Sequence, residues 1–170
     1  MKNLQNDFKA LHALEPRGRI VLRHSAGKMV SMSDAETMMY FYRVLPQGIP
    51  DYLHDRWFFA FCIDCLWEPD QANKKPLESI LSELINDSES TASLQKRIIS
   101  LMDSKWDEDG YFAVKMLRII KLVKQKGYAV NSESLLQSFL HWNDESHWIQ
   151  KKWASAICHS ENINIESKGE

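Results

Sequence analysis

The stretch YFAVKMLRIIKLVKQK, residues 111–126, decides how this chain folds, because it predicts one helix with both a core face and a charged face. At about 100° per residue, one side of that helix is apolar and carries Phe112, Met116, Ile119, Ile120 and Val123. The opposite side is basic, with no acid in the stretch, and carries Lys115, Arg118, Lys121, Lys124 and Lys126. Such a ridge either only solvates the outer face and complements the carbonyl end of the helix, or binds an anion.

The overall composition is that of an ordinary globular protein. A chain of 170 residues with 44% hydrophobic content can bury one substantial core or two small ones. Its formal net charge of −2 excludes a globally basic nucleic-acid binder, so any anion-binding surface must be local. Three cysteines and a polar start, MKNLQND, predict a reducing, cytoplasmic compartment. The longest apolar run, residues 57–63, is far shorter than the roughly 20 residues of a membrane span, so no membrane anchoring is expected.

Two helices are expected at the beginning of the chain. The first starts at Leu4 and stops before Pro16, since the residue before a proline is disfavoured in the α region. The second, RIVLRHSAGK, opens after a glycine and ends at Gly27. Its Arg19 and Arg23 are one turn apart, which predicts that both lie on one exposed face.

The next two helices lead into the middle of the chain. Ser31 or Ser33 can cap a helix that carries MMYFYRV and stops before Pro46. Residues 51–67 then contain WFFAFCIDCLW, which is apolar almost all round and therefore predicts a helix covered by others on most sides.

The polar segment EPDQANKKP, residues 68–76, is the best domain boundary, because it has two prolines and no hydrophobic period. Helical stripes follow at residues 77–85 and 94–102, and Gly127 stops the helix of residues 111–126. The caps expected for the two remaining helices are Asn131 or Ser132, and Asn143 or Asp144.

The predicted fold class is all-α, with about eight or nine helices in two small packed bundles. These bundles are expected at residues 1–67 and 77–158, with 68–76 as the linker and 159–170 as a disordered tail.

The motif Cys62-Ile-Asp-Cys65 has the spacing of a redox pair or of half a zinc site. It lies inside an apolar helix without a second cysteine pair, so buried free thiols are the better interpretation. If Asp64 is buried there, its carboxylate needs a partner such as an arginine or lysine. No nucleophile elbow, zinc-protease motif, P-loop or dinucleotide fingerprint is present, so neither an enzyme nor a cofactor is expected.

Two features could read nucleic acid in other ways. Tryptophans can stack on bases, but most of these lie on apolar stripes, where packing is the expected use; Trp106, in the acidic loop DSKWDEDG, is the exception. A helix-turn-helix over residues 117–142 would use SESLLQSFLHW as its recognition helix, which exposes no lysine or arginine. The positive charge lies on the preceding helix, which fits contact with the backbone of an open strand better than insertion into a major groove.

The order of six motifs resembles the CasB family, the small subunit of the type I-E Cascade CRISPR surveillance complex, over about residues 8–158. The motifs are EPRGRIVLRHSAGK, MMYFYRVLP, LQKRIISLM, VKMLRIIKLV, LLQSFLHWN and IQKKWASAI. The resemblance implies an all-α, non-catalytic protein present as a pair of copies. It implies contact with other Cascade subunits and guide RNA, and with the displaced single DNA strand, which the family holds to stabilise the R-loop.

The same resemblance implies where nucleic acid would bind. The candidate residues that it gives, together with Lys121 of the basic ridge, are Arg19, Arg23, His24, Lys28, Arg43, Lys96, Arg97, Lys115, Arg118 and Lys121. Two further functions remain open at this point, a stand-alone helical DNA-binding regulator and a helical adaptor that binds only protein. They differ in what they predict, because a regulator prefers one duplex sequence and an adaptor binds without salt dependence.

Overall fold

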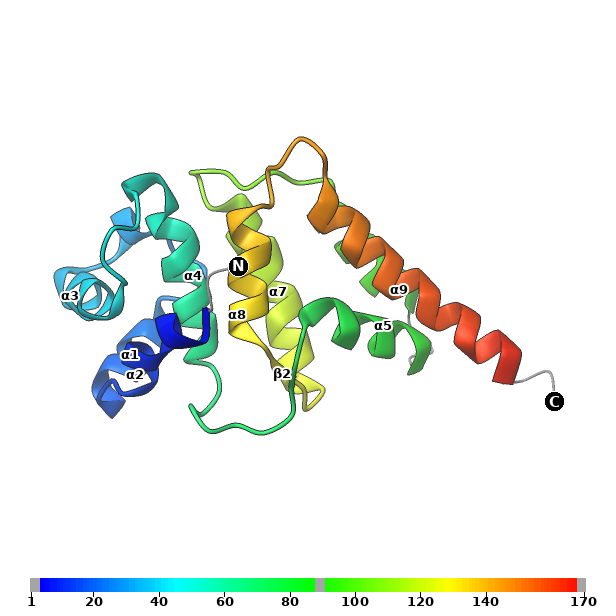
Figure 1. Cartoon of the computed structure of the whole chain (residues 1–170), viewed down its shortest axis with the longest axis horizontal. Coiled ribbons are helices and arrows are strands. Elements are labelled where there is room, and N and C mark those ends of the chain that lie inside the picture. The colour runs from blue at the N-terminus through cyan, green and yellow to red at the C-terminus, as the bar shows by residue number, and fades with distance from the viewer. Residues whose placement is uncertain (1–3, 88–90, 168–170) are drawn as a thin grey trace.

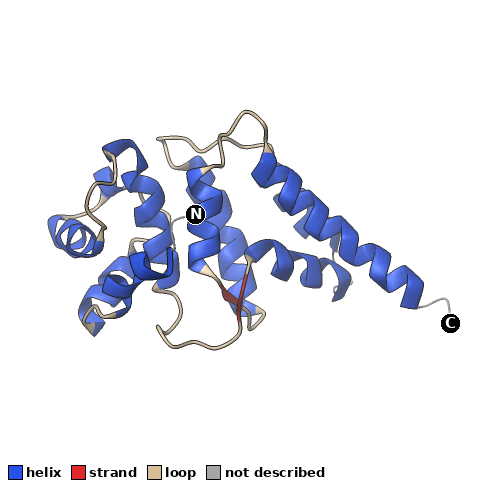
Figure 2. Ribbon diagram, viewed as in Figure 1, coloured by secondary structure: helices blue, strands red, loops and turns tan. Residues whose placement is uncertain are grey.

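The computed structural model describes residues 4–87 and 91–167, and these residues are almost entirely helical (Figures 1 and 2). The elements in order are η1 (Leu4–Phe8), α1 (Lys9–His12), α2 (Pro16–His24), η2 (Val30–Met32), α3 (Ala35–Val44), η3 (Asp51–Leu53), α4 (His54–Asp64), β1 (Lys74–Lys75), α5 (Leu77–Asp87), α6 (Thr91–Met102), α7 (Tyr111–Gln125), β2 (Ala129–Val130), α8 (Ser132–Leu140) and α9 (Trp148–Ser167). The predicted all-α class is confirmed.

Helix α7 has the two faces that its sequence predicts. All five apolar side chains of the predicted core face are buried. The Asp107 carboxylate accepts hydrogen bonds from the backbone N–H groups of Tyr111 and Phe112, which have no partner inside the helix. At the other end Gly127 has φ 87°, the left-handed conformation that stops a helix and favours glycine.

Helix α4 is the covered helix that residues 51–67 predict. Every residue from Trp57 to Asp64 is buried, and α4 packs on α2 at one side and on α8 at the other. Figure 1 shows α4 between the N-terminal helices and the α7–α8 pair. The Phe59 ring stacks on the Phe139 ring of α8 at 5.2 Å, so aromatic packing joins the first half of the chain to the second.

Trp106 is partly buried and packs against this aromatic cluster. Its ring lies 5.2 Å from that of Phe112 and 5.4 Å from that of Phe139. The Asn143 side chain holds the Trp106 backbone through two hydrogen bonds, accepting from its N–H and donating to its carbonyl. Trp106 therefore has a packing role, like most of the other tryptophans.

The segment 68–76 is more ordered than a linker pattern indicates. Its Lys74–Lys75 forms β1, which pairs in parallel with β2, as the two short strands in Figure 2 show. The buried residues of both halves form one contiguous core. The division of the chain into two bundles at this segment stays a prediction.

Two helix starts differ from the sequence-based expectation. Helix α2 begins at Pro16, whose fixed φ suits the first helical position, so Gly18 lies inside the helix. There Gly18 is buried, and a Cβ at this position would come within 2.8 Å of the Tyr40 ring. Helix α3 is capped by Asp34, whose carboxylate accepts from the Thr37 N–H, and not by Ser31 or Ser33.

The C-terminal helices differ in a similar way. Asn131 caps α8 as expected, but α9 begins at Trp148, because Asp144 accepts hydrogen bonds within a tight turn that ends at Ser146. The backbone of α9 is helical as far as Ser167, within the expected tail of 159–170, and residues 168–170 lie outside the described part of the chain. Among the described residues, no helix combines the length and apolar character that crossing a bilayer requires.

Candidate nucleic-acid interface

Five of the ten candidate residues meet in one groove between α6 and α7. The groove has a volume of about 670 Å³. Its lining consists of Lys96, Arg97, Ser100, Lys115, Arg118, Lys121, Leu122 and Gln125. Five of these eight side chains are cationic and none is acidic, so the groove can accept a polyanion.

The periodicity of the two helices produces this groove. Helix α6 buries Leu94, Ile98 and Leu101, which leaves Lys96 and Arg97 on its outer side. Helix α7 returns beside α6 after the loop of residues 103–110. The Lys115 Nζ donates to the Ser104 hydroxyl at 2.7 Å, which ties the beginning of α7 to the end of α6.

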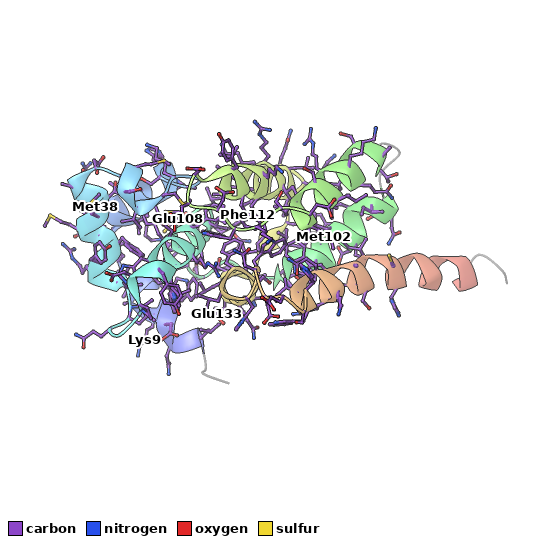
Figure 3. All side chains as sticks on the ribbon, turned by 90° about the horizontal axis from the view of Figure 1, so that it is seen from above. Lys9, Met38, Met102, Glu108, Phe112 and Glu133 are labelled. Carbon is purple, nitrogen blue, oxygen red and sulfur yellow. The ribbon has the colours of Figure 1, made fainter. Side chains whose placement is uncertain are left out.

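The five groove cations carry no ion pair with any carboxylate whose side chain is described. Arg118 and Lys121 are exposed, and Lys115 is half-buried. Nitrogen-tipped side chains project from α6 and α7 on one side of the molecule (Figure 3). Like charges that line one groove repel one another unless an anion lies between them, so this surface favours a phosphate chain.

Three more candidates lie on the segment that reaches the other edge of α7. Gly27 has φ 90°, and a Cβ at this position would lie 2.8 Å from the Leu117 side chain of α7. This close approach brings the end of α2 and its following turn to α7. His24 and Lys28 are exposed there and Arg23 is half-buried, so the segment can extend the basic surface beyond the groove.

Arg19, in contrast, lies in the interior and not on the exposed face expected for it. Its side chain is 11% exposed, and its guanidinium lies 3.6 Å from the Asp64 carboxylate. It also donates to the Trp67 carbonyl at 2.9 Å. Arg19 therefore holds the end of α4 against α2 and is unavailable to nucleic acid.

Asp64 is the buried carboxylate for which the sequence requires a partner. Its side chain is 2% exposed, and besides Arg19 it has His12, whose Nε2 donates to it at 2.9 Å, and the Lys74 ammonium at 3.7 Å. Burial alone would raise the pKa of Asp64, but the His12 hydrogen bond and the charges of His12 and Lys74 outweigh burial, so its pKa lies below the ordinary value. The expectation of a basic partner is confirmed.

Arg43 lies outside the groove. It is on α3, at the opposite side of α4 from α7 in Figure 1. Its guanidinium lies 3.4 Å from the Glu15 carboxylate and 5.1 Å from the centre of the Tyr40 ring. Arg17 pairs with Glu36 on the neighbouring turns of α2 and α3, so the charges around Arg43 are mixed.

Solved structures with the same arrangement of helices include CRISPR proteins. A CRISPR-associated protein of the Cse2 family from Thermus thermophilus superposes with a TM-score of 0.75 at 20% identity, over 94% of this chain and 99% of that one. CasB from M. ruber gives a TM-score of 0.73 at 16% identity, over 98% and 97%. The chain has the Cse2/CasB fold.

A chain of a structure described as a CRISPR RNA-guided surveillance complex shares this fold as well, with a TM-score of 0.72 at 15% identity over 96% of both chains. No protein-family model matches the sequence, and no curated protein sequence matches it significantly. The Cse2/CasB likeness therefore lies in the arrangement of helices, which is retained at identities where sequence signals are weak.

Within the Cse2/CasB fold, α8 cannot act as a recognition helix. Leu135, Leu136 and Phe139 are buried, and α8 packs along α4. A recognition helix must present one side to the major groove, and α8 lacks the exposed side that insertion requires.

Two basic side chains have structural roles that the sequence does not predict. Arg56 donates to the Phe139 and Leu140 carbonyls at the end of α8 and lies over the Trp106 ring. Lys124, part of the basic ridge, donates to the Leu66 carbonyl. Only the three-dimensional neighbours distinguish these cations from those that face solvent, so no signal in the local sequence could have identified them.

The cysteine motif has the buried environment expected for it. Burial raises the pKa of the Cys65 thiol to about 12 and that of the Cys62 thiol well above its ordinary value. Both thiols therefore stay protonated near neutral pH, whereas redox chemistry and metal binding use the thiolate. Among the residues with described side chains, no group of three His, Cys, Asp or Glu could hold a metal ion.

Proposed function

We propose that this chain is the non-catalytic small subunit of a type I-E Cascade complex and binds the displaced DNA strand, which stabilises the R-loop. It would assemble with other Cascade subunits and guide RNA, as a pair of copies. The fold shared with Cse2 and CasB proteins supports the assignment to the complex. The convergence of five cations in the α6–α7 groove carries the assignment of strand binding.

The groove is suited to binding a strand irrespective of its sequence. Lysine and arginine in an open groove contact phosphates, which are the same for every base, whereas sequence reading requires side chains that reach base edges. Formation of an R-loop exchanges one duplex for another of similar stability. A few kcal/mol of strand binding is therefore enough to change how long the loop stays open.

The two other functions receive less support. A stand-alone regulator needs an accessible recognition helix, and α8 is covered by α4. A protein-only adaptor gives no reason for five cations without an ion pair to a described carboxylate to line one groove, because a protein-binding surface with this charge would bind nucleic acid non-specifically as well.

Replacing Lys115 and Arg118 together by alanine tests the proposal in the assembled complex. Permanganate reactivity of unpaired thymines would report whether the displaced strand is held. We expect the variant to assemble normally but to leave the displaced strand more reactive and the R-loop shorter-lived. Its unfolding free energy should fall by no more than about 1.5 kcal/mol, because Arg118 is exposed and Lys115 gives up only its hydrogen bond to Ser104.

A matched control removes the same amount of charge elsewhere. Lys9 and Lys151 are exposed and outside the groove, and Lys9 lies away from α7 in Figure 3. Lys9→Ala combined with Lys151→Ala should leave the strand protected. Equal protection in the groove variant would contradict strand binding by the groove, and failure to assemble would indicate that the groove contacts a protein subunit.

A further inference from the structure

Tyr111 is the exposed aromatic side chain closest in sequence to the groove cations. It is the first residue of α7 and is 71% exposed. No ring contact or side-chain hydrogen bond of Tyr111 is found among the described residues, so packing does not account for an aromatic ring here. The face of its ring is therefore open to contact with a ligand.

The position of Tyr111 on α7 continues the line of the groove. Residues at i, i+4, i+7 and i+11 share one face of a helix, and these positions are Tyr111, Lys115, Arg118 and Leu122. The last three line the groove. Tyr111 thus lies one turn beyond Lys115 on α7. At a rise of 1.5 Å per residue, it is about 15 Å along the helix axis from Lys121.

The charge at this end of the groove excludes phosphate but not a base. Glu108 and Asp109 immediately precede the turn into α7 and are exposed, and Asp107 binds the first two N–H groups of the helix. Figure 3 marks this acidic loop at Glu108. A phosphate would be repelled by these three carboxylates, whereas a nucleobase is uncharged and can approach the ring.

Tyr111 is also held firmly enough to act as a platform. Its backbone N–H donates a hydrogen bond to the Asp107 carboxylate, and the helix fixes the direction of its side chain. A tyrosine has only two side-chain torsions to order, so stacking costs little conformational entropy.

We propose that Tyr111 stacks on an unpaired base of the strand whose phosphates lie along the α6–α7 groove, an inference that rests on the proposed function. The ligand is a nucleobase of any type, because every base offers a π-face. Lys115 and Arg118 hold the phosphates next to that base. The acidic loop beyond Tyr111 then marks the point where the strand leaves this subunit.

Two substitutions and two ligands test this stack. The purified full chain would be titrated with fluorescent oligothymidylate and with an oligonucleotide of the same length that is abasic throughout its centre. Tyr111→Leu should weaken binding of the thymidine strand about fivefold or more, the loss expected for one base–aromatic stack. Tyr111→Phe keeps the ring and should bind as the wild type does.

The abasic strand separates stacking from phosphate contact. It retains every phosphate, so the wild type and Tyr111→Leu should bind it equally, and the salt dependence of both should be the same. Tyr52→Leu serves as control, because Tyr52 is 79% exposed but lies on η3, away from the groove.

The outcomes distinguish this inference from the proposed function. No salt-dependent binding of single strands by the wild type would overturn both. Normal binding by the wild type with no loss in Tyr111→Leu would overturn the stack alone, as would an equal loss on both strands. A Tyr111→Leu variant that binds DNA normally but assembles poorly with its partner subunits would assign the ring to a protein contact and overturn the stack.

Discussion

Replacing Arg19 by methionine distinguishes a buried structural arginine from a nucleic-acid contact. Methionine retains most of the apolar volume of the arginine stem but removes the guanidinium. The change therefore leaves Asp64 without its nearest arginine and the Trp67 carbonyl without its donor.

The size of the effect follows from burial. Removing one partner of a buried ion pair costs about 3–5 kcal/mol, because the remaining charge is left without compensation. Asp64 keeps His12 and Lys74, so we expect the lower end, about 3 kcal/mol. For a chain of this length that corresponds to a fall of roughly 6–12 °C in Tm.

Urea unfolding followed by circular dichroism would measure the change, with Arg118→Met as the matched exposed control. Arg118→Met should alter the unfolding free energy by less than about 0.5 kcal/mol and weaken binding of single-stranded DNA. Refolded Arg19→Met should bind DNA like the wild type at temperatures where it is folded. An Arg19→Met variant with wild-type stability and weakened DNA binding would refute the structural assignment.

Two further predictions concern the fold around the site. The pKa of Asp64 is lowered in the folded state, so its ionised form stabilises the protein. This stabilisation is complete above the unfolded-state pKa of about 3.9 and is lost as the pH falls through the lowered folded-state pKa. Urea unfolding should thus show that the stability difference between the wild type and Asp64→Asn shrinks below about pH 4. A difference that grows on acidification would contradict stabilisation by the ionised Asp64. In thermal unfolding, Gly27→Ala should destabilise the protein by about 1 kcal/mol more than Gly48→Ala does. Both glycines have positive φ, but only at position 27 would the added Cβ also clash with the Leu117 side chain. The reverse order would argue against close packing of this turn on α7.

The sequence predicts those features that are determined within one helix. The buried face of α7, the covered character of α4 and the stop at Gly127 all follow from residues a few positions apart. The groove cannot be predicted from one helix alone, because it depends on which helix packs beside α7. Resemblance to a family supplied the candidate residues on both helices, and their convergence required the structure.

Arg19 illustrates why local spacing fails. Arg19 and Arg23 are one turn apart, as exposed pairs often are, yet Asp64 lies 45 residues further along the chain and draws Arg19 inward. The same limit explains the caps, since Asp34 and not Ser33 lies where the first N–H groups of α3 can reach a side-chain oxygen. Ser31, Ser33 and Asp34 all carry a side-chain oxygen, so which of them caps α3 depends on the backbone conformation, which the sequence leaves open.

The salt dependence of single-strand binding measures whether the groove cations contact phosphates. Each phosphate neutralised by a protein cation contributes about −0.7 to the slope of log affinity against log salt for a single strand. Removing Lys115 and Arg118 should make the slope shallower by about 1.4, while removing Lys9 and Lys151 should leave it unchanged. Equal slopes for the wild type and the groove variant would contradict strand binding by the groove, because Lys115 and Arg118 would then not contact phosphates.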